Sequence, residues 1–127
     1  MIVYLDTSAL VKLIVAERES VALRRFLRSH PERVTAALAR TELSRTCPGE
    51  SAAVRQRARQ VLQGLDIVPL TDLLLDLAGE LLPRRLRSLD AIHLAAAKLV
   101  GADRVVTYDR RMGSAARELG LELEAPR

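Results

Sequence analysis

Short apolar runs and longer amphipathic stretches alternate along the chain. The short runs are rich in Val and Ile and are bounded by polar or turn residues, which is typical of strands buried in a sheet. The longer stretches repeat their apolar residues at helical spacing, as in residues 19–30, where arginines occupy the opposite face. Strands that alternate with helices in this way indicate an α/β fold around a parallel sheet.

The pattern predicts five strands and seven helices. The strands are expected at Ile2–Leu5, Arg33–Thr35, Asp66–Pro69, Arg104–Thr107 and Leu121–Glu124. The helices are expected at Thr7–Ala16, Glu19–His30, Leu38–Thr46, Ala52–Leu65, Thr71–Leu82, Leu89–Val100 and Arg110–Leu119. The breaker Cys47-Pro48-Gly49 separates the third helix from the fourth. A chain of 127 residues without a repeat or linker is expected to form one domain over residues 1–127.

The positive charge of the chain is almost all arginine. The formal charge is +4, and Lys12 and Lys98 are the only lysines. Arginine makes bidentate contacts to phosphate, so this balance favours a polyanionic partner, although a biased genomic base composition would produce the same excess. The aromatic residues are limited to Tyr4, Phe26 and Tyr108. Stacking of bases on aromatic rings is therefore not expected to dominate nucleic-acid binding.

Cysteine content and hydropathy indicate the cellular compartment in which the protein is expected to work. Cys47 is the single cysteine, which excludes an intrachain disulfide and zinc clusters built on cysteine and favours the reducing cytoplasm. The chain reaches Asp6 without a basic segment ahead of an apolar one, so a signal peptide is not expected. No apolar run is long enough to cross a bilayer, and we therefore expect no membrane association.

Two aspartates follow predicted strands. Asp6 comes directly after Ile2–Leu5, and Asp109 follows Arg104–Thr107. Both are therefore expected at the carboxyl edge of the sheet, where ligand sites of open α/β folds collect. Each aspartate also precedes a predicted helix. A capping role, in which the carboxylate accepts a helix N–H, explains either residue equally well when it is taken alone.

Two further acids lie in predicted helices. Asp90 falls in the first turn of a helix that Ser88 could cap, where the helix dipole favours a negative charge. Glu42 lies inside the helix Leu38–Thr46, where neither a cap nor the dipole requires it, and a solvated glutamate is the simpler explanation. Together, however, the four acids can converge at one sheet edge, which four independent caps would not need to do.

Carboxylates gathered at one edge would repel one another unless cations were bound. A ligand set made only of oxygen suits Mg²⁺ or Mn²⁺. Such an ion activates water, orients a phosphodiester and stabilises charge on the attacking and leaving oxygens. The acids therefore indicate a metal site that could hydrolyse a phosphodiester, and nothing in them discriminates RNA from DNA.

Four segments of the chain resemble those of the PIN-domain ribonucleases and, within that family, of the VapC toxins. The matching segments are Leu5–Lys12 (LDTSALVK), Thr41–Leu43 (TEL), Arg87–Ala95 (RSLDAIHLA) and Thr107–Met112 (TYDRRM). They follow the order and spacing of the family, and the resemblance covers essentially the whole chain.

The resemblance implies a three-layer α/β/α sandwich with a central, mostly parallel sheet of about five strands. It implies that Asp6, Glu42, Asp90 and Asp109 are the catalytic residues, which bind Mg²⁺ or Mn²⁺ and hydrolyse RNA. It also implies the toxin of a type II toxin–antitoxin system, which forms a homodimer and has a VapB-like antitoxin that blocks the site. The RNA targets of the family vary, so the identity of the substrate is not implied.

Polar residues beside the acids could support them. Thr7 and Ser8 could orient Asp6 or a metal-bound water, although each could equally complete the helix end. Thr107 could do the same near Asp109, with the same alternative. These hydroxyls are therefore candidate supporting residues.

Basic residues and a histidine lie close to two of the acids in sequence. The arginines are Arg84, Arg85 and Arg87, just ahead of Asp90, and Arg110 and Arg111, just after Asp109. They could bind the RNA backbone, or form a solvated surface. His93 shares a helix face with Asp90. Its apolar neighbours favour a packed histidine with one satisfied hydrogen bond over a general base or a metal ligand.

Two other classes of protein need comparison. A response-regulator receiver domain also has an acidic Mg²⁺ pocket, but it requires a second acid beside Asp6 and a lysine near the last strand, and this chain has neither. The second class is a PIN-like module that is catalytically weak and acts mainly by binding RNA or a partner. That module is the alternative function.

Overall fold

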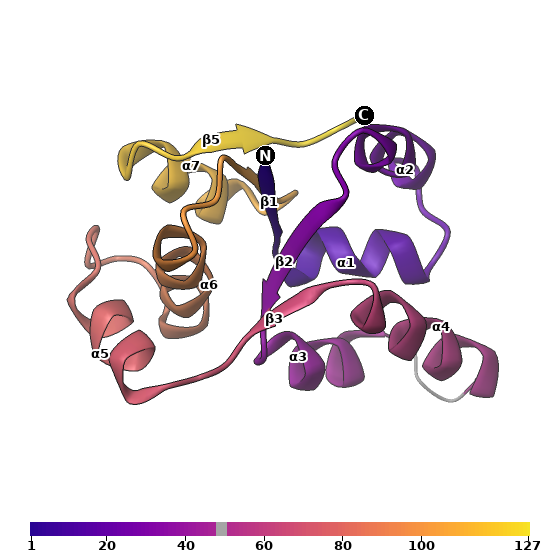
Figure 1. Ribbon diagram of the computed structural model, residues 1–127, viewed down its shortest axis with the longest axis horizontal. Helices are drawn as coiled ribbons and strands as arrows, with labels where there is room; N and C mark the ends of the chain where they lie inside the picture. Colours follow the sequence, from indigo (N-terminus) through magenta and orange to yellow (C-terminus); the bar gives the residue numbers. More distant parts are fainter. Residues whose placement is uncertain (48–50) are drawn as a thin grey trace.

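The computed structural model describes residues 1–47 and 51–127. Within these residues the strands are β1 (Ile2–Leu5), β2 (Glu32–Ala36), β3 (Asp66–Val68), β4 (Arg104–Val106) and β5 (Glu122–Glu124). They form one sheet in the order β3-β2-β1-β4-β5, and every neighbouring pair is parallel (Figure 1). The sheet that was expected to be mostly parallel is therefore parallel throughout.

The helices follow the predicted order. They are α1 (Thr7–Ile14), α2 (Ser20–Arg28), α3 (Ala39–Thr46), α4 (Ala52–Gln63), α5 (Asp72–Glu80), α6 (Ser88–Leu99) and α7 (Arg110–Glu118). Their ends differ from the predicted ends by no more than two residues, because fraying and capping blur helix boundaries in a sequence pattern. Helix α3 ends before Cys47, as predicted, whereas Pro48 and Gly49 of the breaker lie outside the described residues.

Helices cover both faces of the sheet, which gives the predicted three-layer α/β/α arrangement. Helices α1 to α4 lie on one face and α5 to α7 on the other (Figure 1). Alternate residues of β1 serve the two cores, since Tyr4 packs with the α5–α7 layer while Val3 and Leu5 pack with the α1–α4 layer. No helix in the described ranges is long and apolar enough to cross a bilayer.

The strand order places a topological switch between β1 and β4. The chain leaves β1 toward β2 and β3, and later returns to add β4 on the other side of β1. Crevices at such a switch, beyond the carboxyl ends of the strands, are where open α/β folds bind ligands. Asp6 follows β1 at this point, and its N–H donates to the carbonyl of Val106 at the end of β4 (3.2 Å).

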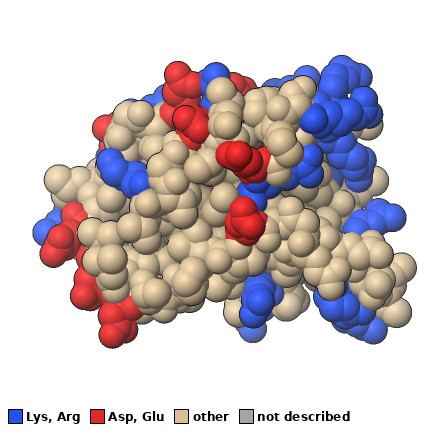
Figure 2. Space-filling model, viewed as in Figure 1, with Lys and Arg blue, Asp and Glu red and all other residues tan. Residues whose placement is uncertain are grey.

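Charge is distributed unevenly over the surface. Figure 2 shows Lys and Arg gathered on the side of the molecule where α2 and α4 lie, and Asp and Glu gathered over α5. The acids of α5 are Asp72, Asp76 and Glu80. A net charge of +4 therefore coexists with one acidic helix, which is unsuited to contact with a phosphate backbone.

Candidate active site

The four acids singled out from the sequence line one cleft of about 230 Å³. Asp6 and Asp109 reach it from the ends of β1 and β4, Glu42 from α3, and Asp90 from the first turn of α6. The other lining residues are Thr7, Ser8, Val11, Thr46, His93 and Met112. Among the described residues that line this cleft there is no Lys or Arg, and His93 is the single basic side chain.

Asp6 is buried and anchored on both carboxylate oxygens. Its Oδ1 accepts the N–H of Ala9 (3.0 Å), which caps α1, and the hydroxyl of Ser8 (2.7 Å). Its Oδ2 accepts the hydroxyl of Thr107 (2.5 Å). Burial raises the pKa of Asp6 above its usual value despite these hydrogen bonds. Asp6 is thus a helix cap and also a wall of the acidic cleft.

Asp109 is an exposed helix cap at the mouth of the cleft. Its Oδ1 accepts the N–H groups of Arg111 (2.8 Å) and Met112 (3.1 Å) at the start of α7. Its own N–H donates to the hydroxyl oxygen of Thr107 (3.1 Å). Because Thr107 also donates to Asp6, this single threonine links the two strand-end acids.

Asp90 is half-buried in the first turn of α6. The expectation that Ser88 caps this helix is wrong: the cap position is Arg87, whose side chain makes no capping bond, and Ser88 is the first helical residue. Burial, and then the negative charge of Asp109, raise the pKa of Asp90 above its usual value. The negative charge of Asp6 acts in the same direction, whereas His93 and Arg87 partly offset this repulsion.

Glu42 is held by side chains rather than by the backbone. Its Oε1 accepts the hydroxyl of Thr7 (2.7 Å) and the Nε2–H of His93 (2.6 Å). Burial acts to raise the pKa of Glu42, but these hydrogen bonds outweigh it and the pKa lies below its usual value. Thr7, a candidate partner of Asp6 by sequence, therefore supports Glu42, whereas Ser8 does contact Asp6.

His93 is packed as expected, but its hydrogen bonding is richer than expected. Its side chain is 1% exposed, and both ring nitrogens are bonded, with Nδ1 lying 2.7 Å from the hydroxyl of Tyr4. The sequence predicted one hydrogen bond because apolar neighbours surround His93 in α6. Nothing in the sequence indicated a role for Tyr4 beside the site, because an aromatic residue inside a buried strand is normally a core residue.

The cleft has the donor set of a site for a hard divalent cation. No three acidic, His or Cys side chains of the described residues surround one point closely enough to hold an ion as they stand. Both oxygens of Asp6, and one oxygen each of Glu42 and Asp109, are instead turned toward protein donors. Oxygen-only ligands and the raised pKa values of Asp6 and Asp90 nevertheless fit Mg²⁺ or Mn²⁺.

A second cleft of about 440 Å³ adjoins the acidic one and shares Asp90 with it. Its basic lining residues are Arg85, Arg87, Arg110 and Arg111. Arg84 lies apart from them, in a cavity beside α5. Arg85 also pairs with Glu118 of α7 (2.8 Å). The structure thus groups four of the five candidate arginines and separates the fifth, because the side chains of the neighbouring Arg84 and Arg85 line different cavities.

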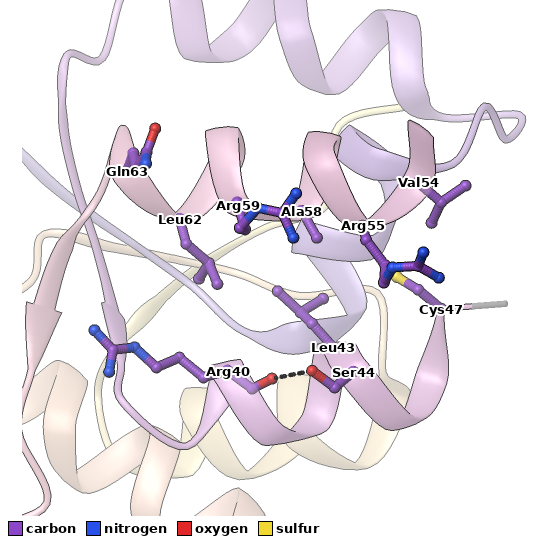
Figure 3. Close-up of a pocket in the computed structure, with 10 residues that line it drawn as sticks. All are labelled: Arg40, Leu43, Ser44, Cys47, Val54, Arg55, Ala58, Arg59, Leu62 and Gln63. Atoms are coloured by element: carbon purple, nitrogen blue, oxygen red, sulfur yellow. Dashed lines mark hydrogen bonds between the residues drawn. The ribbon is translucent and has the colours of Figure 1, made fainter. Parts of the chain in front are cut away.

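A further cavity lies between α3 and α4, and none of the four acids is among its described lining residues (Figure 3). It has a volume of about 460 Å³ and an apolar floor edged by arginines. The apolar residues include Leu43, Val54, Ala58 and Leu62, and the arginines are Arg40, Arg55 and Arg59. It contains no carboxylate among its described lining residues, so it is not a candidate metal site.

Comparisons with known proteins agree with this geometry. The model of the PIN domain family matches residues 3–118. Ribonuclease VapC46 of Mycobacterium tuberculosis (strain H37Rv) is 50% identical over 126 residues, covering 98% of this chain and 97% of that protein. Ribonuclease VapC47 of the same species (strain CDC 1551) is 42% identical over 135 residues, with 98% and 96% covered.

A solved structure, VapBC2 from Rickettsia felis bound to a DNA fragment from its promoter, shares the fold. The match has a TM-score of 0.75 at 18% identity and covers 100% of both chains. The structural match covers the full length of both chains, and the sequence matches cover nearly the full length of this chain. The chain therefore belongs to the PIN domain family and, within it, to the VapC ribonucleases.

The substitution Asp6→Asn should stabilise the metal-free protein at pH 7. Because burial raises the folded-state pKa of Asp6, stability is highest below the unfolded-state pKa and falls as pH rises through the folded-state pKa. Asn removes this charge and keeps a capping oxygen. We expect a higher Tm in EDTA by calorimetry, by about 4 °C for each kcal/mol relieved.

The exposed Asp72→Asn serves as the matched control and should leave Tm nearly unchanged. The difference between Asp6→Asn and the native chain should shrink as the pH is lowered toward 4. A lower Tm for Asp6→Asn at pH 7, or a difference independent of pH, would contradict the charge penalty at Asp6.

Proposed function

We propose that this chain is a Mg²⁺- or Mn²⁺-dependent endoribonuclease, and that it acts as the toxin of a type II toxin–antitoxin system. The observation that carries the proposal is the single cleft in which Asp6, Glu42, Asp90 and Asp109 meet with no Lys or Arg among the described lining residues. The relatives named as VapC ribonucleases over nearly the full length support the reaction class. Residues 1–127 are proposed to form one PIN domain that works in the cytoplasm.

The four carboxylates are proposed to hold the cation. When bound, the cation supplies an activated water and stabilises charge on the leaving oxygen of the phosphodiester. Ser8 and Thr107 keep Asp6 in place, and Thr7 keeps Glu42 in place. The ordered hydroxyls and N–H groups therefore hold like charges together before any cation or substrate arrives.

The adjoining basic cleft is proposed to bind the RNA backbone. Asp90 lies in the wall between the acidic cleft and the arginines, so a strand running along the arginines passes over the acids. Arg87, Arg110 and Arg111 are exposed and can reach phosphates without losing a strong internal partner. Arg84 lies outside this cleft and is not expected to contribute directly.

RNA cleavage should require both the cation and the acids. We expect the purified chain to cut RNA in Mg²⁺ or Mn²⁺, leaving 5′-phosphate and 3′-hydroxyl ends, and to lose activity in EDTA. Asp6→Asn and Asp90→Asn should each lower the rate at least about 100-fold, since each removes a ligand charge. Gel analysis of end-labelled RNA and DNA measures the cleavage and the choice of polymer.

Asp103→Asn, at an exposed carboxylate away from the cleft, is the control and should retain full activity. Cleavage that persists in EDTA and in both acid variants would refute a metal-dependent site. Tight RNA binding without any cleavage would instead identify a catalytically weak binding module.

The arginines should act through phosphate contacts. Arg87→Ala and Arg110→Ala should weaken RNA binding at low salt and should each reduce the slope of log affinity against log salt by about 0.7, the value for one phosphate contact on a single strand. Fluorescence anisotropy with Asp90→Asn as the background prevents cleavage during the titration. Arg28→Ala on α2 is the control, and an equal loss in that variant would exclude the basic cleft as the binding surface.

An antitoxin of the VapB type is the proposed protein partner. The solved complex of VapBC2 contains such a pair, and it supports the same pairing here by its fold. The cavity between α3 and α4 is the surface that we assign to the partner, because its apolar floor and arginine edge fit an amphipathic segment with acidic flanks (Figure 3).

A second copy of the chain is the other proposed partner. Helix α5 exposes Leu73 (59%) and Leu77 (38%), which lie one turn apart and continue from the exposed Leu70 (42%). A contiguous apolar stripe of this kind on a soluble domain is typical of a protein interface. The stripe therefore supports homodimerisation through α5.

Toxicity in cells should depend on the acidic cleft. Expression without the antitoxin should arrest growth within a few generations, and Asp6→Asn should relieve the arrest while the protein accumulates to at least the same level. Co-expression of the cognate antitoxin should restore growth of cells that make the unaltered chain. Growth curves with immunoblots measure both quantities, and equal toxicity of Asp6→Asn would point to binding rather than catalysis.

A further inference from the structure

A buried chain of polar groups ends on one acid of the cleft. The hydroxyl of Tyr4 lies 2.7 Å from Nδ1 of His93, Nε2 of His93 lies 2.6 Å from Oε1 of Glu42, and Thr7 donates to the same oxygen (2.7 Å). These residues come from β1, α6, α3 and α1. The hydrogen bonds thus join four elements behind a single carboxylate.

The burial of this chain makes its hydrogen bonds costly to break. Tyr4 has no exposed surface, and the side chain of His93 is 1% exposed. Polar groups buried in a core destabilise the fold unless they are paired, and every buried side-chain polar atom of the described residues has a partner. An apolar residue would fill the position of His93 at lower cost. Packing alone therefore does not account for the histidine.

Glu42 differs from the strand-end acids in how it is held. Asp6 and Asp109 each accept backbone N–H groups at the start of a helix, which fixes their direction. Glu42 lies within α3, carries a longer and more flexible side chain, and has no such backbone donor among the described residues. Its position depends on Thr7 and His93, and both bind Oε1, which leaves Oε2 for a cation.

Tyr4 determines how the imidazole ring of His93 is used. An ionised carboxylate only accepts hydrogen bonds, so Nε2 of His93 must carry the proton that it shares with Glu42. In the neutral ring Nδ1 is then an acceptor, and the phenol hydroxyl of Tyr4 supplies the donor.

We infer that His93 is a positioning residue that holds Glu42 in the cation-binding orientation, and that Tyr4 fixes His93 for this task. The inference rests on the proposed cation site. Helix α6 then has two roles, because it carries the ligand Asp90 and, one turn later, the residue that orients Glu42. Replacing a residue that orients a metal ligand from behind typically lowers metal affinity or activity by about 10- to 100-fold.

Direct titration with Mn²⁺ tests this role without relying on activity. The electron paramagnetic resonance signal of free Mn²⁺ gives the Kd, and a parallel assay gives the Mn²⁺ concentration for half-maximal RNA cleavage. We expect His93→Ala to weaken Mn²⁺ binding about 10- to 100-fold. His93→Gln should recover most of that loss, because its amide nitrogen can donate to Glu42 from the place of Nε2.

Two further variants separate positioning from packing. Tyr4→Phe keeps the ring in the core and removes only the hydroxyl, so it should weaken Mn²⁺ binding by a smaller factor than His93→Ala does. Leu94→Ala, at the next and fully buried residue of α6, should lower Tm and leave the Kd for Mn²⁺ unchanged. Far-ultraviolet circular dichroism confirms that each variant is folded during the titration.

The outcomes distinguish this inference from the proposed function. If the native chain binds Mn²⁺ and folded His93→Ala binds it equally well, positioning by His93 is wrong while the cation site stands. Equal losses in His93→Gln and His93→Ala, or an unchanged Kd in Tyr4→Phe if His93→Ala does not fold, would also overturn the inference. A native chain that neither binds Mn²⁺ nor cleaves RNA would overturn both proposals.

Discussion

Repulsion among four carboxylates in one small cleft is the constraint that the surrounding structure has to satisfy. The fold meets it with donors supplied from several elements. Asp6 accepts a helix N–H and two hydroxyls, Asp109 accepts two helix N–H groups, and Glu42 accepts hydrogen bonds from Thr7 and His93. Asp90 has the least support, and its pKa is raised by burial and by Asp109. Charge held in this way costs stability, which is a common property of sites shaped for binding.

The division of positive and negative charge follows from the same constraint. If arginines lined the acidic cleft, they would neutralise the carboxylates and compete with a cation. The structure instead places Arg87, Arg110 and Arg111 in the next cleft, with Asp90 in the shared wall. The proposed cation site and the proposed phosphate-binding surface can therefore be adjusted separately, while the start of α6 and the residues that follow β4 keep the two clefts adjacent.

The order of elements was predictable because it depends on local periodicity. Apolar alternation and helical spacing predicted every strand and helix of the described residues, with errors of one or two residues at the ends. The strand-end positions of Asp6 and Asp109 also follow from local pattern. Capping of α6 by Ser88 was predicted wrongly, because a serine before an apolar helix satisfies the capping pattern whether or not the backbone turns there.

By itself, then, the sequence determined the α/β class, the helix and strand order and which four acids could meet, since these depend on spacing along the chain. Only the tertiary structure decided that Thr7 and His93 serve Glu42, that Tyr4 lies behind His93, and that Arg84 lies apart from its neighbours. Those contacts join residues far apart in sequence, and a hydrogen bond of about 3 Å depends on side-chain directions that no linear pattern records.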